Sequence, residues 1–137
     1  MQIFAVVVAW LLTAFLAFTY FKAGSFKLTA PIATLVEAGM GWAGKISPAT
    51  VRLIAALELL GAAGIVLAPI ASEFLGFSWA QPIGVAAAAG LTLVMVVAMI
   101  MHGARGETKY TIKINSALLI AAGALTALLA AFGGKVL

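Results

Sequence analysis

Four long apolar runs constrain the fold of this chain more than any other feature. They cover approximately residues 3–21, 51–68, 83–101 and 114–132. Each is close to the roughly 20 residues that a helix needs to cross the hydrocarbon core of a bilayer. Hydrophobic residues make up 65% of the 137 residues and charged residues only 9%, against about 25% charged in a typical soluble domain. We therefore expect an all-α fold, a single integral membrane domain (residues 1–137) that forms an up–down four-helix bundle in the lipid bilayer.

The connections between the runs contain several helix-start and helix-stop signals. Ser47-Pro48 is a typical helix start, with Ser as the N-cap and Pro at the first helical position. Pro69 is expected to end or kink the helix that follows. In the first connection, Pro31 can begin a short helix that Gly39 caps, and a tryptophan follows at position 42. Such a segment, residues 31–43, is typical of the membrane interface, and an ordinary surface loop is the alternative.

The basic residues predict an orientation. Seven of them lie in or beside the first and third connections, and the second connection has none: Lys22, Lys27, Lys45, Arg52, Arg105, Lys109 and Lys113. Basic residues accumulate in cytoplasmic loops, so we expect these two connections in the cytoplasm and both termini outside. Lys135 near the C-terminus opposes this assignment.

The second run carries a carboxylate, Glu58, well inside its length. A charged side chain near the bilayer centre costs about 2.5–3.5 kcal/mol on insertion scales, so such residues usually face the bundle interior and have a partner. Arg52 lies six residues earlier, about 120° away around the helix, and does not share a face with Glu58. The partner is expected on another helix or in the first connection. Glu58 either takes part in function or is a neutral packing element that a hydroxyl group satisfies.

Up–down topology brings several polar and aromatic residues to one end of the bundle. They are Tyr20, Lys27, Trp42, Arg52, Glu58, His102 and Asn115. A carboxylate and an imidazole can transfer protons, so Glu58 and His102 are the candidate catalytic residues. The remaining five are candidate ligand-binding residues. Most of these residues also have a structural explanation. His102 at a helix end can complement the helix dipole, and Arg52 can extend to the lipid headgroups. Lys27 can be a loop charge, and Tyr20 and Trp42 can be interfacial anchors.

Small residues within the runs predict close helix packing. Gly61 and Gly64 are the clearest helix-packing positions, with further small residues at Gly84, Gly90 and Gly123. Glycine lets two helix backbones approach closely within a membrane.

The composition excludes several kinds of chemistry. The chain has no cysteine, so disulfides, thiolate metal ligands and iron–sulfur ligation are excluded. One histidine cannot form a bis-histidine haem site, and the carboxylates do not have a metal-ligand spacing. We expect neither a metal site nor an intrinsic cofactor. The net charge of +4 is explained by basic membrane-flanking loops, and nucleic-acid binding is not expected.

The segment from Arg52 to Gly64, RLIAALELLGAAG, resembles the helix-2 signature of the DoxX-like family, approximately R-x-I-G-x-x-E-x-x-G-x-x-G-L. Ala55 stands where the signature has its first glycine. The resemblance covers essentially the whole chain, with supporting residues around Lys27 and His102. It implies a four-helix protein of the bacterial inner membrane. Some members resemble the small subunit of a thiosulfate:quinone oxidoreductase, and the fold is similar to that of eukaryotic sterol-isomerase and sterol-binding proteins.

Three functional hypotheses follow, and a fourth is a small-solute transporter, for which the four helices would have to oligomerise to form a pathway. The first is an accessory subunit of a membrane oxidoreductase that binds a quinone or another small lipophilic molecule near Glu58, alongside a soluble or membrane redox partner. The second is a stand-alone binder or isomerase of a lipophilic ligand, with Glu58 as general acid and base. The third is a structural membrane anchor or homo-oligomer, in which Glu58 and His102 contribute only to stability.

Overall fold

The computed structural model describes residues 2–132 and shows four long helices joined by short segments. No strand occurs in this range, so the expected all-α fold is confirmed. The elements in chain order are α1 (Gln2–Thr29), α2 (Ile32–Glu37), η1 (Gly41–Gly44), α3 (Pro48–Phe74), η2 (Ser78–Ala80), α4 (Gln81–Ala104) and α5 (Thr108–Ala131).

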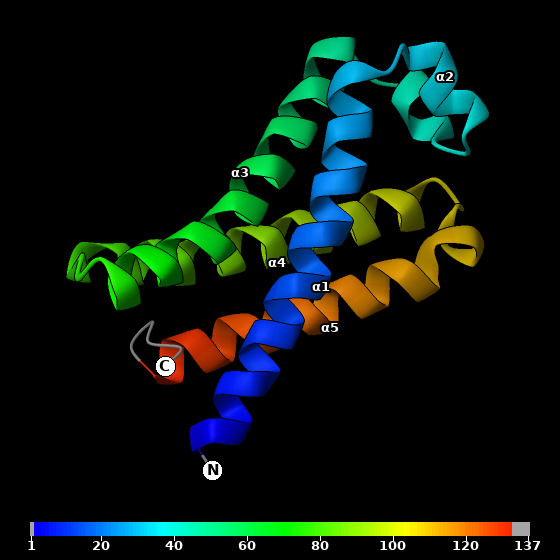
Figure 1. Cartoon of the computed structure of the whole chain (residues 1–137). Helices are drawn as coiled ribbons and strands as arrows, with labels where there is room; N and C mark the ends of the chain where they lie inside the picture. Colours follow the sequence, from blue (N-terminus) through cyan, green and yellow to red (C-terminus); the bar gives the residue numbers. More distant parts are fainter. Residues whose placement is uncertain (1, 133–137) are drawn as a thin grey trace.

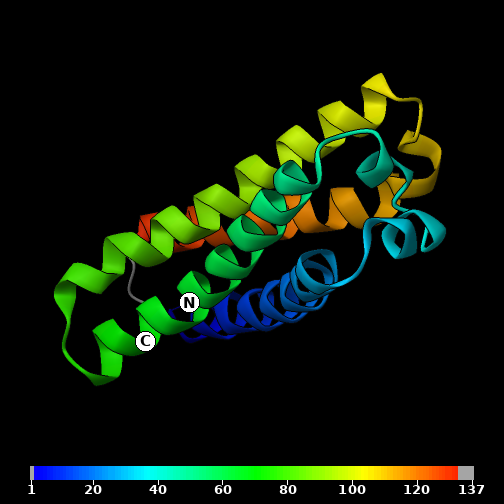
Figure 2. The ribbon, with the colours of Figure 1, turned by 90° about the horizontal axis from the view of Figure 1, so that it is seen from above.

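The long helices form a four-helix bundle in which α1 packs against α3, α3 against α4, α4 against α5, and α5 against α1. Figure 2 shows α2 and the α4–α5 turn at one end of the bundle and the α3–α4 connection at the other. This is the up–down arrangement that the sequence predicts. We call the end that carries α2, η1 and the α4–α5 turn the polar end, because the buried charged residues described below lie toward it.

All four long helices have the length and hydropathy of membrane spans. Many large apolar side chains point away from the bundle; Phe4, Leu60 and Ile120, for example, are 74%, 68% and 70% exposed. A soluble protein does not expose apolar surface of this extent, whereas lipid tails cover it at no cost. The chain is therefore a multi-pass membrane protein.

Two of the predicted helix boundaries are wrong at the polar end. The first helix continues past residue 21 to Thr29, so Lys22 and Lys27 are helical and do not lie in a connection. The last helix begins at Thr108, so Lys109 and Lys113 belong to α5, and the third connection shortens to residues 105–107. The sequence locates the apolar runs, but the helices extend beyond them because the hydrogen bonds of a helix join backbone groups and do not require apolar side chains.

The signals around α3 are confirmed at its start and differ near its end. Ser47 is the N-cap, its hydroxyl accepts a hydrogen bond from the Thr50 amide at 3.2 Å, and Pro48 occupies the first helical position. Pro69 does not end the helix, which continues to Phe74 and changes direction along its length (Figure 1). The buried Pro69 ring packs beside Gly84 of α4, where a side chain larger than glycine would contact it.

The glycines fall into two groups. A Cβ at Gly61 would collide with the Leu91 side chain, and a Cβ at Gly64 would lie 2.6 Å from the Ala87 Cβ, so both allow α3 to approach α4 closely, as predicted. Gly90 and Gly123 meet no atom within 4 Å in the described part of the chain. The expectation that these two also serve helix packing within the bundle is wrong, because both lie away from the neighbouring helices.

The segment between α1 and α3 is ordered, as expected. Pro31 precedes α2, and Gly39 follows it with a φ of 95°, a conformation that glycine adopts without strain. The segment forms a second small core, separate from the main one, in which Leu35, Trp42 and Val51 are buried together. Its position at the polar end brings Trp42 near the last turn of α4.

Candidate functional site

Glu58 lies inside the bundle because it shares the buried face of α3. The buried positions of this helix include Val51, Ala55, Glu58, Ala62 and Ile65, which recur at intervals of three and four residues. This periodicity defines one side of a helix, so the carboxylate lies on the face of α3 that points into the bundle and not toward lipid. Glu58 is only 4% exposed.

The partner of Glu58 is Lys27, from the last turn of α1. The ammonium nitrogen lies 2.5 Å from both carboxylate oxygens, and Lys27 is 7% exposed. The expectation that the partner comes from another helix is confirmed. An ion pair in this environment offsets part of the hydration that both groups lose. The ammonium group donates its hydrogen bond to Oε1, and Oε2 makes no hydrogen bond among the described residues.

Arg52 binds the same part of α1 through its backbone. Its guanidinium group donates to the carbonyl oxygen of Lys27 and, at 2.7 Å, to that of Ala30. The last carbonyls of a helix have no partner within the helix, so these bonds cap the C-terminus of α1. Arg52 therefore links α1 to α3.

His102 forms a second polar cluster with a residue that the sequence analysis did not identify. Its Nδ1 lies 2.9 Å from the Glu107 carboxylate, and its ring makes a T-shaped contact with the Trp42 ring, with centroids 6.5 Å apart and an angle of 82° between the planes. The tight turn between α4 and α5 brings Glu107 back toward His102, and Gly106 takes the required φ of 70°. An acid five residues after a histidine, across a Gly-x-x-Gly turn, was the available signal.

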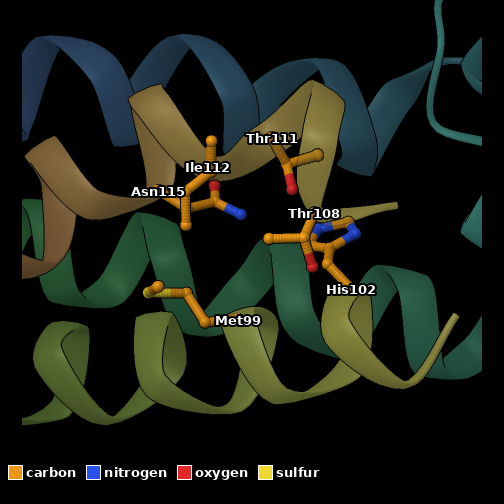
Figure 3. Close-up of a pocket in the computed structure, with 6 residues that line it drawn as sticks. All are labelled: Met99, His102, Thr108, Thr111, Ile112 and Asn115. Carbon is orange, nitrogen blue, oxygen red and sulfur yellow. The ribbon is translucent and has the colours of Figure 1, made fainter. Parts of the chain in front are cut away.

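Asn115 lies across from His102, on the first turns of α5. Both side chains line a small hollow together with Met99, Thr108, Thr111 and Ile112 (Figure 3). Asn115 is 9% exposed, and its amide nitrogen has no hydrogen-bond partner among the described residues. The free volume is about 10 Å³, enough for roughly one water molecule or one ligand oxygen atom.

Tyr20 belongs to the main core and not to either polar cluster. It is 1% exposed, and its hydroxyl donates to the Leu91 carbonyl of α4 at 3.4 Å. The alternative of Tyr20 as an interfacial anchor is therefore wrong, because the ring lies between α1 and α4.

The predicted site residues thus separate into two groups. Lys27, Arg52 and Glu58 lie together between α1 and α3, whereas Trp42, His102 and Asn115 lie toward the α4–α5 turn. Among the residues that the structure describes, no three His, Asp or Glu side chains are placed to hold one metal ion.

Comparison with known proteins gives the family. The model of the DoxX-like family matches residues 11–130, a range that begins within α1 and reaches the last turn of α5. The chain belongs to the DoxX-like family. It matches no curated protein and no solved structure. In this DoxX-like protein, the Arg52 and Glu58 of the helix-2 signature are the two side chains that hold Lys27.

Proposed function

We propose that this DoxX-like protein is an accessory subunit of a membrane oxidoreductase, and that it binds a quinone or another small lipophilic molecule at the polar end of its bundle. The observation that supports this proposal is the position of the buried ionisable groups. Lys27, Glu58 and His102 are each less than 10% exposed. Ionisable residues inside a membrane protein are costly, and they commonly mark ligand or proton pathways.

The composition supports an accessory role. The chain has no cysteine and one histidine, so thiolate-ligated clusters and bis-histidine haem need ligands from another chain. Electron transfer then belongs to a soluble or membrane partner. The DoxX-like protein provides a lipid-embedded platform and a binding place for the lipophilic molecule.

The charge distribution supports an orientation in the bacterial inner membrane. Lys22, Lys45, Arg105, Lys109 and Lys113 all lie toward the polar end, and the α3–α4 connection has no basic residue. By the positive-inside rule, the polar end faces the cytoplasm and both termini lie outside. A soluble partner would therefore dock from the cytoplasmic side.

A purely structural role is the second candidate, favoured by the pairing of Glu58 with Lys27. The ammonium group at 2.5 Å compensates the charge of the carboxylate without a ligand. The same contact is unfavourable for a stand-alone isomerase with Glu58 as its acid and base, because Lys27 would have to release the carboxylate before proton transfer.

Native mass spectrometry from mild detergent tests the proposal. Wild type, Glu58→Gln and His102→Gln are compared with Glu73→Gln, a control at the other end of α3. We expect a quinone-sized adduct or a co-purified redox partner with wild type and the control, and its loss in the Glu58 or His102 variant. Identical adducts, partners and oligomeric states in all four proteins would instead support the structural role.

A further inference from the structure

The hollow between α4 and α5 contains an unsatisfied hydrogen-bond donor. Asn115 is 9% exposed, and its amide nitrogen makes no hydrogen bond within residues 2–132. Figure 3 shows this nitrogen directed toward the side of the hollow where Thr108 and His102 lie. A buried donor without an acceptor costs about 1–3 kcal/mol, so a water molecule or a ligand oxygen in the hollow is expected to accept from it.

The second polar group of the hollow is His102. An ionised carboxylate only accepts hydrogen bonds, so the 2.9 Å contact with Glu107 places a proton on Nδ1. The other ring nitrogen, Nε2, is then an acceptor in the neutral ring and a donor in the protonated ring. Glu107 thus fixes the tautomer of His102 and leaves one imidazole nitrogen for a ligand.

The remaining lining is apolar or only weakly polar and reaches the outside of the bundle. Met99 and Ile112 provide apolar surface, and Ile112 is 38% exposed at the rim. The hollow admits about one oxygen atom, while the apolar part of a ligand would lie outside it against this rim. A charged headgroup does not fit these dimensions.

We propose that this hollow binds the carbonyl oxygen of an apolar molecule, with the Asn115 amide as the donor. Nε2 of His102 can donate to the same oxygen only when the ring is protonated. This inference rests on the proposed function for the idea of a bound lipophilic molecule, but it places the polar head of that molecule away from Glu58. Two membrane components carry such a carbonyl group, a quinone ring and the ester linkage of a phospholipid.

Tryptophan fluorescence provides the readout, because Trp42 packs edge-on against His102. In a Trp10→Phe/Trp79→Phe background, the full chain is placed in nanodiscs of ether-linked lipid, which has no ester carbonyl. A decyl-tailed benzoquinone is then titrated, with decylbenzene as a probe that lacks the carbonyl group. We expect saturable quenching by the quinone only, and an affinity about tenfold lower for Asn115→Leu, as expected for one lost hydrogen bond.

Two further variants control for folding. Thr126→Val, on the same helix and away from the hollow, should bind like the unsubstituted background. Ile112→Phe fills the rim from an exposed position and should also weaken binding about tenfold even if Asn115→Leu folds poorly. Equal affinity of Asn115→Leu, Ile112→Phe and the background would overturn the assignment of the hollow, while quinone binding lost only in Glu58→Gln would leave the proposed function standing.

Native mass spectrometry in ester-linked lipid separates the two sources of the carbonyl group. No quinone binding in ether lipid, combined with phospholipid retained by wild type and lost in Asn115→Leu, would support the hollow as a lipid-ester site and count against the quinone proposal. No dependence on Asn115 in either lipid would overturn the inference.

Discussion

Arg52 and Glu58 both bind Lys27. The guanidinium group of Arg52 donates to the backbone carbonyl of Lys27, and the carboxylate of Glu58 accepts from its ammonium group. The two signature residues lie about 120° apart around α3, yet they act on the same turn of α1. The side chain and the helix end are therefore fixed together, so both signature positions contribute to the position of α1 relative to α3.

Replacing one member of the Lys27–Glu58 ion pair should lower the unfolding free energy more than replacing both members. Glu58→Leu or Lys27→Met leaves one buried charge without a partner, and we expect a loss of about 3–5 kcal/mol in unfolding free energy. The double variant should recover most of that loss, because two apolar side chains can pack in the same space. Unfolding in mixed micelles, arranged as a double-mutant cycle, measures the coupling. Additive losses would contradict the pairing.

Arg52→Lys should loosen the end of α1. Lysine cannot reproduce the forked contact with two carbonyl groups, and we expect a loss of roughly 1–2 kcal/mol together with faster hydrogen exchange in the last turn of α1. Arg105→Lys, in the α4–α5 turn, is the matched control. Unchanged exchange between Phe26 and Ala30 in Arg52→Lys would show that the cap does not hold the helix end.

Alanine at Gly61 and at Gly90 should have opposite effects. A Cβ at Gly61 collides with Leu91, so Gly61→Ala should cost about 1–3 kcal/mol, as overpacked cores do. Gly90 has open space around it, so Gly90→Ala should be neutral or stabilising by up to about 1 kcal/mol through its higher helix propensity. Thermal unfolding in one detergent compares the two variants directly, and equal losses would refute the close approach of α3 and α4.

Two substitutions at Tyr20 distinguish a core residue from an interfacial anchor. Tyr20→Phe removes only the 3.4 Å contact with the Leu91 carbonyl and should cost less than about 1 kcal/mol. Tyr20→Ala leaves a cavity between α1 and α4 and should cost about 3–5 kcal/mol. The unfolding free energy of each variant in mixed micelles is the measurement. Small effects of both substitutions would mean that the ring does not fill the core.

The four-helix bundle could be predicted from the sequence, because four apolar runs of bilayer length are compatible with few other folds. The positions at which the helices end at the polar end could not be predicted. Lys22 and Lys27 are charged residues that suggest a loop after the first apolar run. In the structure they are helical, because Glu58 pairs with Lys27 and Arg52 binds the carbonyl groups at the end of α1. These stabilising contacts come from a helix more than 20 residues away in sequence, so local patterns do not contain them.

The candidate site was predicted in part. The inward position of Glu58 followed from the cost of a charge in the bilayer, and its 120° separation from Arg52 indicated a partner from elsewhere. The pairing of His102 with Glu107 depends on the backbone path through Gly106, and the unsatisfied Asn115 amide depends on how α5 packs against α4. The first feature has only a weak signal in the sequence, the acid five residues after His102, and the second has none. The catalytic and ligand-binding roles of these residues stay predictions.

The Lys27–Glu58 contact also has a consequence for how the chain enters the membrane. Helix α1 carries an ammonium group and α3 carries a carboxylate, and each charge raises the cost of inserting its own helix alone. Only when both helices are present does each charge find its partner. Insertion of α1 and α3 as a paired hairpin is therefore favoured over insertion of one helix at a time, which ties the biogenesis of the N-terminal half to the synthesis of α3.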